Sequence, residues 1–274
     1  MSEILKAVIL GIVEGLTEWL PISSTGHMIL VDEFLKLNVS DAFRELFLVV
    51  IQLGAILAVV VLFWKKIWPF SIREGRLRAD RGILSLWLKI LVACVPAGVV
   101  GLLFDKQMNA LFYNYQTVAV MLILFGLLFL WVEDRNKDRT PRIKNTSAIS
   151  YRMAMIIGVF QMIAAVFPGT SRSGATIIGG LMLGISRTVA AEFTFVLAIP
   201  AMFGASLLKL VKFGFSFSGK EIAILLTGMA VAFVVSMVSI RFLMGYIRKH
   251  SFKVFGWYRI VLGVVVLAYF WLLK

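Results

Sequence analysis

Ionisable and hydroxylated side chains that could form a catalytic site gather in one short stretch near the start of the chain. The stretch contains two carboxylates, two serines and a histidine, interrupted by a proline: Glu14, Glu18, Pro21, Ser23, Ser24 and His27. Carboxylates four residues apart share one face of a helix, and a histidine can act as acid, base or nucleophile near neutral pH. A turn at the proline would bring these groups together. The stretch therefore favours acid–base or nucleophilic chemistry carried out by Glu14, Glu18, Ser24 and His27.

A second polar stretch offers ligands for an anion. Residues Gly169 to Gly174 read Gly-Thr-Ser-Arg-Ser-Gly, and Thr176 follows them. Arginine binds phosphate oxygens through two parallel hydrogen bonds, and free N–H groups at a helix N-terminus also favour an anion. We expect Arg172 to bind a phosphate group, with small hydroxylated residues around it: Ser23, Ser171, Ser173 and Thr176.

Simpler structural interpretations exist for the same residues. Ser23 and Ser24 could cap the helix that follows them, and Arg172 could pair with Glu14 or Glu18. The two carboxylates do not resemble an ordinary solvated helix end, because mostly apolar residues flank them on both sides. Inside a membrane protein, ionisable groups are costly unless they face the protein interior and find partners.

The elements that must position these residues are membrane helices. Of 274 residues, 60% are apolar and only 16% charged, whereas charged residues make up about a quarter of soluble domains. A helix needs about 20 apolar residues to cross a bilayer. Six runs approach that length: Leu46 to Trp64, Leu86 to Phe104, Thr117 to Val132, Ala190 to Val211, Ile222 to Met244 and Phe255 to Leu273. We predict an all-α integral membrane protein, with residues 1–274 forming a single membrane domain.

The two polar stretches interrupt two further apolar regions. Ile4 to Leu20 stops at Pro21, and a short apolar run to Leu35 follows; Tyr151 to Phe167 stops at Pro168, and a short run to Ile185 follows. Proline ends a helix, and polar backbone at membrane depth survives only where protein or water shields it from lipid. Each region therefore predicts a re-entrant helix hairpin. We expect the first to be retained rather than cleaved as a signal peptide, since it contains acids and lacks a small-residue cleavage pattern.

These two regions are copies of one another. At an offset of 147 residues the matches include Gly11 with Gly158, Pro21 with Pro168, Ser24 with Ser171 and Glu45 with Glu192. Repeat 1 covers about residues 1–134 and repeat 2 about 148–274, joined by a basic linker. Each copy holds one hairpin and three spans, an odd number, which predicts an inverted-topology repeat with its site near the midplane.

The two copies have diverged in their chemistry. At the positions of Glu14, Glu18 and His27, the second copy has Gln161, Ala165 and Gly174, but it gains the arginine. We interpret the first copy as the reacting half and the second as the phosphate clamp. Glu45 and Glu192 open matched spans, where acids suit a helix N-terminus at least as well as a direct role.

Loop charges predict the orientation in the membrane. The formal net charge of +13 would suggest nucleic acid in a soluble protein, but most of the surplus lies in three loops: Trp64 to Gly82, Glu133 to Ser150 and Gly245 to Lys253. The positive-inside rule places these loops in the cytoplasm, and hence both termini outside. We expect no nucleic-acid partner, contact with anionic lipid headgroups, and a site that opens to the outer face. One cysteine, Cys94, excludes an intramolecular disulfide.

At these motifs the sequence resembles the undecaprenyl-diphosphate phosphatase family, also known as bacitracin-resistance proteins. The first motif is Glu14-Gly-Leu-Thr-Glu18-Trp-Leu-Pro-Ile-Ser-Ser-Thr-Gly-His27 and the second Pro168-Gly-Thr-Ser-Arg-Ser-Gly-Ala-Thr176. The resemblance implies a multi-pass enzyme of the bacterial inner membrane. Such an enzyme hydrolyses undecaprenyl diphosphate to undecaprenyl phosphate and inorganic phosphate at the outer face, recycling the lipid carrier for cell-wall synthesis.

The resemblance also implies roles for particular residues. Glu14 and Glu18 would bind a divalent cation, with Mg²⁺ the first expectation and Ca²⁺ the alternative, or act as acid and base. Ser24 and His27 would form the catalytic pair, and Arg172 would bind the diphosphate with Ser171, Ser173 and Thr176 around it. Ser24, His27 or an activated water could each attack the phosphorus. The sequence leaves a homo-oligomer open, and the architecture alone would also suit an inverted-repeat transporter or flippase for a polyprenyl phosphate.

Overall fold

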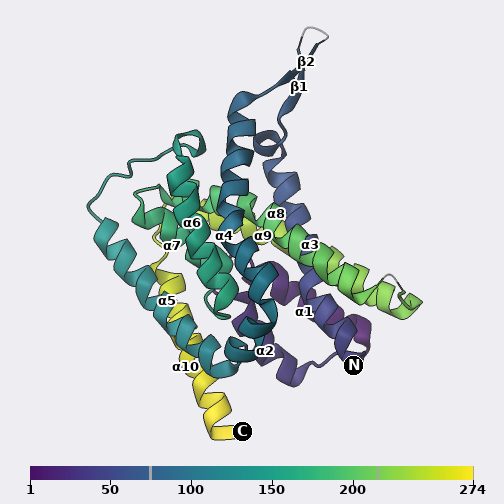
Figure 1. The fold of residues 1–274 in the computed structure, drawn as a ribbon. Helices are drawn as coiled ribbons and strands as arrows, with labels where there is room; N and C mark the ends of the chain where they lie inside the picture. Colours follow the sequence, from purple (N-terminus) through teal and green to yellow (C-terminus); the bar gives the residue numbers. More distant parts are fainter. Residues whose placement is uncertain (74–75, 215, 274) are drawn as a thin grey trace.

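A computed structural model describes residues 1–73, 76–214 and 216–273 of the chain. The described helices and strands, drawn in Figure 1, are α1 (Glu3–Thr17), α2 (Ser24–Phe34), α3 (Asp41–Ile67), β1 (Phe70–Arg73), β2 (Arg76–Ala79), α4 (Arg81–Phe112), α5 (Tyr115–Asn136), the short 3-10 helix η1 (Thr146–Ala148), α6 (Tyr151–Val166), α7 (Arg172–Met182), α8 (Arg187–Phe213), α9 (Gly219–Tyr246) and α10 (Lys253–Leu273).

Six of the described helices are long and apolar enough to cross a membrane: α3, α4 as far as Phe104, α5, α8, α9 and α10 as far as Leu272. The prediction of six spans is therefore confirmed, and the chain is a multi-pass membrane protein. Several helices begin ahead of the apolar run that predicted them. Ser40, Asn114 and Ser186 each cap a spanning helix by accepting a backbone N–H with the side chain, and such polar caps lie outside an apolar run.

One loop departs from the all-α prediction. Part of the basic segment between the first two spans forms an antiparallel ribbon, in which Phe70 pairs with Ala79 and Ser71 with Arg78. The ribbon projects from one end of the molecule, and both chain termini lie at the opposite end (Figure 1). Two strands alone are marginal in water, so the ribbon is an appendage of the helical bundle.

Two helix pairs fold back on themselves where the sequence predicted hairpins. Along α1 and α2 the chain turns back towards the end with the termini, whereas along α6 and α7 it turns back towards the end with the ribbon (Figure 1). Both first helices stop short of their proline: α1 ends at Thr17 and α6 at Val166. The bends therefore begin several residues before α2 and α7, and Glu18 is the C-cap of α1 rather than part of its regular helix.

The two bends end in the same unusual backbone conformation. Ser23 and Ser171 have φ angles of 73° and 67°, and the hydroxyl of each accepts the N–H of the glycine three residues later. Positive φ is strained for a residue with a Cβ and is found at functional sites. Each strained serine sets the direction in which the next, 11-residue helix begins.

Serine caps recur in the two halves of the chain at spacings close to the offset of the sequence comparison. Ser23 matches Ser171 at an offset of 171 − 23 = 148, and the caps Ser40 and Ser186 match at 186 − 40 = 146. The caps are thus spaced one residue away from the ungapped offset of 147, at which Pro21 and Pro168 of the same bends match. Ser24, not the Thr25 of the ungapped comparison, then corresponds to Arg172, since Ser24 and Arg172 are each the first residue of their helix.

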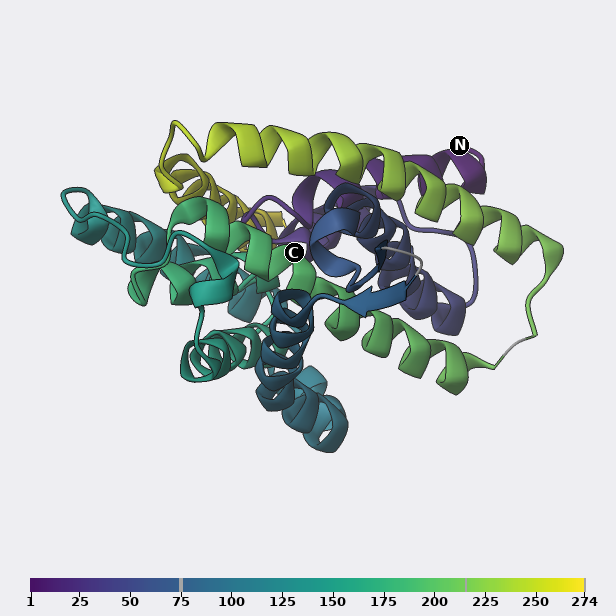
Figure 2. The same ribbon diagram turned by 90° about the horizontal axis from the view of Figure 1, so that it is seen from above.

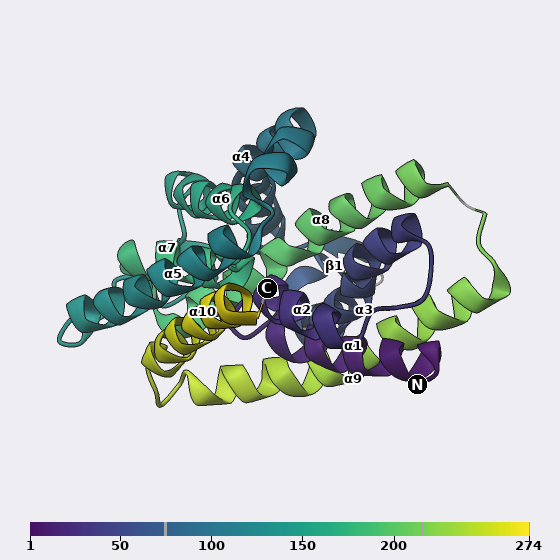
Figure 3. The same cartoon turned by 90° about the horizontal axis from the view of Figure 1, so that it is seen from below.

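Packing of the long helices leaves the bends at the centre. α5 lies alongside α10, α1 alongside α9, α4 against α6, and α3 between α8 and α9 (Figures 2 and 3). Close approach depends on glycine: a Cβ at Gly54 would lie 2.1 Å from the Met229 carbonyl oxygen, and one at Gly158 would lie 2.4 Å from that of Ala93.

Salt bridges join the ends of α3 and α8. Lys66 near the end of α3 binds Glu192 near the start of α8 at 2.7 Å, and Lys209 near the end of α8 binds Glu45 near the start of α3 at 3.2 Å. The two helices therefore run antiparallel. Glu45 and Glu192 each lie near the start of their helix, as the N-terminus interpretation requires, and each also forms an ion pair with the other helix of the pair.

Candidate active site

The two bends meet at the carboxylate of Glu18. One oxygen, Oε2, accepts a hydrogen bond from the Ser24 hydroxyl at 2.8 Å, and the other, Oε1, accepts one from Arg172 Nη2 at 3.0 Å. The backbone carbonyl of Glu18 also accepts the Ser173 hydroxyl at 3.0 Å. One buried acid thus holds a hydroxyl from the first hairpin and a guanidinium from the second.

The local folding of both bends explains this meeting. Ser24 and Arg172 each follow a strained serine cap and open a helix, α2 and α7. The first turn of a helix carries backbone N–H groups without helical partners and the positive end of the helix dipole. Two such N-termini lie on either side of Glu18, so the region around Ser24 and Arg172 favours a further negatively charged group besides the Glu18 carboxylate.

The Arg172 guanidinium is held in place by hydrogen bonds, but one of its N–H donors has no acceptor in the described part of the chain. Its Nη1 donates to the Thr194 carbonyl at 3.2 Å, Nη2 donates to Glu18, and Nε is buried without a hydrogen-bond partner among the described residues. The guanidinium also lies 6.0 Å from the centre of the Trp19 ring. Buried donors left without an acceptor are costly. An incoming phosphate oxygen could satisfy the Nε donor.

Glu14 lies one turn before Glu18 and is almost fully buried, with 1% of its surface exposed. Its Oε1 has no hydrogen-bond partner among the described residues. Mg²⁺ and Ca²⁺ bind carboxylate oxygens, and Mg²⁺ typically takes one or two protein carboxylates together with substrate phosphates. No described part of the chain groups three or more acidic, histidine or cysteine side chains as a closed metal cage. The orphaned oxygen beside Glu18 fits a cation that is shared with a phosphate ligand.

His27 lies close to the site but is oriented by other residues. Its Nδ1 is 2.7 Å from the Ser23 carbonyl oxygen, which can only accept, so Nδ1 carries a proton. Nε2 lies 2.7 Å from the Tyr258 hydroxyl, and the planes of the two rings are within 6° of parallel. The described contacts of His27 are thus to Ser23 and Tyr258 and do not include the Ser24 hydroxyl. Glu18, not His27, contacts the Ser24 hydroxyl.

The hydroxyls expected around the phosphate mainly support the second bend. Ser171 caps α7 and lies 3.1 Å from the Ser173 hydroxyl. Thr176 donates to the Arg172 carbonyl at 2.9 Å and accepts from the Thr194 hydroxyl. Ser23 plays the capping role in the first bend. These residues lie near Arg172 as expected, but their described contacts position the bend that carries it.

Two residues that sequence reasoning missed come from α10. Arg259 is fully buried, and its Nη2 donates to the carbonyls of Thr170 at 2.8 Å and Gly169 at 3.0 Å, while Nη1 donates to that of Pro21 at 3.3 Å. One guanidinium thus joins both bends. Tyr258, the preceding residue, orients His27. An arginine inside the last apolar run was the available signal, because an ionisable residue at membrane depth marks function by default.

Comparison with known proteins places the chain in a family. The family model of the bacitracin resistance protein BacA matches residues 7–265. The chain belongs to the bacitracin resistance protein family. It is 68% identical over 270 residues to the undecaprenyl-diphosphatase of Desulfitobacterium hafniense, covering 98% of this chain and 97% of that protein. Undecaprenyl-diphosphatase 1 of Clostridium acetobutylicum is 62% identical over 268 residues, with 98% and 97% covered.

Proposed function

We propose that the chain is an undecaprenyl-diphosphatase, which hydrolyses undecaprenyl diphosphate to undecaprenyl phosphate and inorganic phosphate. One observation carries the chemistry: Glu18 holds the Ser24 hydroxyl and the Arg172 guanidinium at 2.8 and 3.0 Å. A nucleophile, a base and a phosphate ligand within one site are what phosphoryl transfer requires. The names of relatives at 53–68% identity, covering nearly the whole chain, support the same substrate.

In the reaction, Ser24 is the nucleophile and Glu18 its base. The Ser24 oxygen forms a bond to the terminal phosphorus, and the proton passes to Glu18. The bond between that phosphorus and the bridging oxygen breaks, and undecaprenyl phosphate leaves. Water then hydrolyses the phosphoserine. Arg172 is paired with Glu18 in this structure. During the reaction some of its guanidinium N–H groups turn to the phosphate oxygens, where negative charge develops. His27 is not in contact with the Ser24 hydroxyl and serves as a secondary proton site beside Tyr258.

Glu14 and Glu18 would hold the divalent cation, Mg²⁺ or Ca²⁺. The cation would supply neutralisation of the negative charge on the diphosphate. The buried Glu14 oxygen without a partner supports this assignment, since a buried carboxylate without a cation or donor is costly. Glu18 already binds Ser24 and Arg172, whereas Oε1 of Glu14 has no described partner and would be available to the cation.

The two halves form an inverted repeat of re-entrant hairpins, with the site between their bends. The hairpins turn back towards opposite ends of the molecule (Figure 1), and α3 and α8, at matching places in the two halves, run antiparallel. Basic residues concentrate in the loops of the ribbon end, which the positive-inside rule assigns to the cytoplasm. Both termini then face outwards, and we infer that the site opens to the outer surface of the bacterial inner membrane.

Phosphate release from the purified protein in detergent tests this function. No transport is possible without a membrane, so release of inorganic phosphate from undecaprenyl diphosphate separates an enzyme from a carrier of the same architecture. We expect release that depends on Mg²⁺ or Ca²⁺. Absence of release with either metal present would reject the enzyme.

A further inference from the structure

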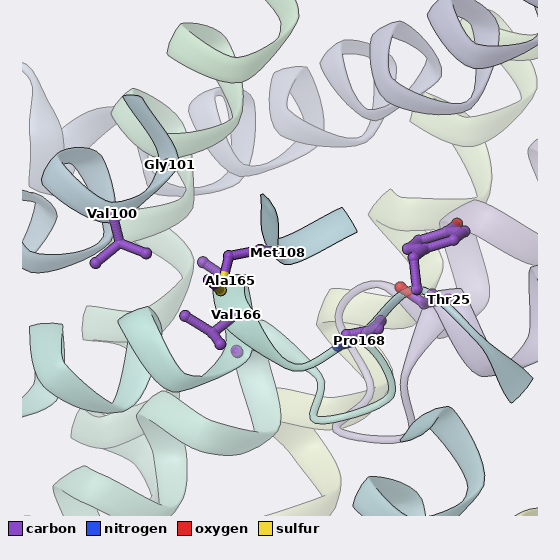
Figure 4. Close-up of a pocket in the computed structure, with 9 residues that line it drawn as sticks. Thr25, Val100, Gly101, Met108, Ala165, Val166 and Pro168 are labelled. Carbon is purple, nitrogen blue, oxygen red and sulfur yellow. The ribbon is translucent and has the colours of Figure 1, made fainter. Parts of the chain in front are cut away.

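Beside the bends lies a cavity of about 200 Å³ that the chemistry described so far does not use. Its lining residues are Val100, Gly101 and Met108 of α4, Ala164 to Val166 at the end of α6, Thr25 in the first turn of α2, and Pro168 in the second bend. Tyr113, just after α4, completes the lining. Figure 4 shows Thr25 and Pro168 at one side of the cavity, and Val100, Met108 and Val166 at the other.

Two lining residues of the cavity lie next to the catalytic residues along the chain. Thr25 directly follows Ser24, and Pro168 directly precedes the Gly169 bend that leads to Arg172. A molecule whose head group lay between Ser24 and Arg172 would therefore extend past Thr25 and Pro168. Beyond them it would meet the apolar side chains of α4 and α6. The cavity has the Thr25 hydroxyl at one side and hydrocarbon side chains at the other. This arrangement is complementary to the junction between a diphosphate and a prenyl chain.

The outer half of α4 leaves a path from this cavity to the lipid. Buried residues of α4 stop at Ala93, and no side chain described beyond that point is buried. Leu102 and Leu103 are 74% and 64% exposed, and a Cβ at Gly98 or Gly101 would meet nothing within 4 Å. In Figure 3 this helix projects away from the rest of the molecule. An apolar helix face in a bilayer is in contact with lipid chains.

We propose that this cavity binds the first unit of the substrate's prenyl chain, and that the rest of the chain leaves along the outer half of α4 into the bilayer. The proposal rests on the proposed function, since it assigns one part of that substrate. The volume suits the role: a cavity of about 150 Å³ accommodates benzene, so 200 Å³ takes one branched five-carbon unit with little room for a second. The small residues Gly101 and Ala165 keep that space clear.

Gly101→Leu and Gly98→Leu form a matched pair of variants. Both glycines lie on α4 and are open to an added side chain, but only Gly101 lines the cavity. We expect Gly101→Leu to lower kcat/KM for undecaprenyl diphosphate at least about tenfold, the loss of roughly two buried methylene groups, and to do so mainly through KM. Gly98→Leu should remain within about twofold of wild type, as remote surface substitutions do.

Photo-crosslinking locates the chain directly. A prenyl diphosphate with a diazirine on its first isoprene unit should label wild-type residues 100–108 or 164–168, and Gly101→Leu should abolish that label. Labelling confined to α2 or α10 would overturn the proposal. So would equal activity losses in both leucine variants together with a changed oligomeric state, which would mean that a second copy of the chain covers α4. Phosphate release by the wild type in the same preparation tests the proposed function separately, so the two failures are distinguishable.

Discussion

Glu18→Gln removes the proposed base without changing the shape of the side chain. Glutamine can still accept the Ser24 hydroxyl and occupy the space beside Arg172, but it cannot take up a proton at neutral pH. At the residue where the two hairpins meet, the substitution therefore keeps the side-chain shape and removes the proton acceptor.

The size of the effect follows from the burial of this site. Positioned general bases contribute about 10²–10⁴-fold to rate, which is about 3–5 kcal/mol at 1.36 kcal/mol per tenfold. The carboxylate of Glu18 and the guanidinium of Arg172 are 8% and 15% exposed, so the loss of the negative charge also leaves a buried cation unpaired. Removing one partner of a buried pair costs about 3–5 kcal/mol of stability. We expect kcat to fall by about 10²–10⁴-fold and the melting temperature to fall as well.

Glu133→Gln is the matched control for the stability change. Glu133 is a buried carboxylate that binds Arg187 and the Phe252 N–H, away from the bends. This variant should lose thermal stability while the folded protein keeps kcat within about twofold of wild type. Phosphate release and thermal unfolding, measured on the same detergent-purified samples, give both numbers. If folded Glu18→Gln keeps more than about a tenth of the wild-type kcat, Glu18 is not the base.

Three further substitutions and one metal experiment follow from the same geometry. Arg172→Lys should lower phosphate release at least about 10²-fold, because a point charge cannot replace the fork; near-normal turnover would remove Arg172 from its role. Arg259→Met should lower both the melting temperature and kcat, since it leaves the carbonyls of both bends unpaired, and unchanged unfolding would show that Arg259 does not join the bends. Tyr258→Phe should shift the pH profile of kcat while leaving the unfolding temperature nearly unchanged, because only the hydrogen bond to His27 is lost; an unaltered profile would exclude His27 as a proton site. Chelation of divalent cations should abolish phosphate release, and Mg²⁺ or Ca²⁺ should restore it; full activity in chelator would exclude the cation.

Sequence patterns predicted the spans and the bends because both depend on local properties. An apolar run of span length forms a transmembrane helix in a bilayer. Proline followed by small polar residues interrupts a helix. The pairing of Arg172 with a hairpin carboxylate was also among the interpretations that the sequence offered. What remained hidden was which carboxylate, since that depends on where α1 ends relative to Pro21.

The contacts of α10 could not be predicted from the sequence. Arg259 binds carbonyls about 90 and 238 residues earlier in the chain, and a backbone carbonyl leaves no signature in residue types. The spacing of the serine caps was missed for a related reason: the cap offsets of 148 at the bends and 146 at the third helix average to the ungapped 147. That average matched Ser24 with Ser171, and so concealed that Ser24 and Arg172 open equivalent helices.

The ribbon of the first basic loop was also missed. Six basic residues between Trp64 and Gly82 dominated the interpretation as a solvated cytoplasmic loop. Charges report which side of the membrane a loop occupies, but they do not report its backbone pairing. The strands Phe70–Arg73 and Arg76–Ala79 are too short for periodicity to distinguish them from a turn.

Trapping of the transferred phosphate tests most directly whether Ser24, held by Glu18, is the reacting group. Undecaprenyl diphosphate radiolabelled in its terminal phosphate is mixed with the purified protein and quenched in acid at short times. We predict label on the peptide that contains Ser24, and neither label nor more than about a hundredth of the wild-type phosphate release in Ser24→Ala, while Ser71→Ala in the exposed ribbon behaves as wild type. Undiminished phosphate release by Ser24→Ala would contradict it.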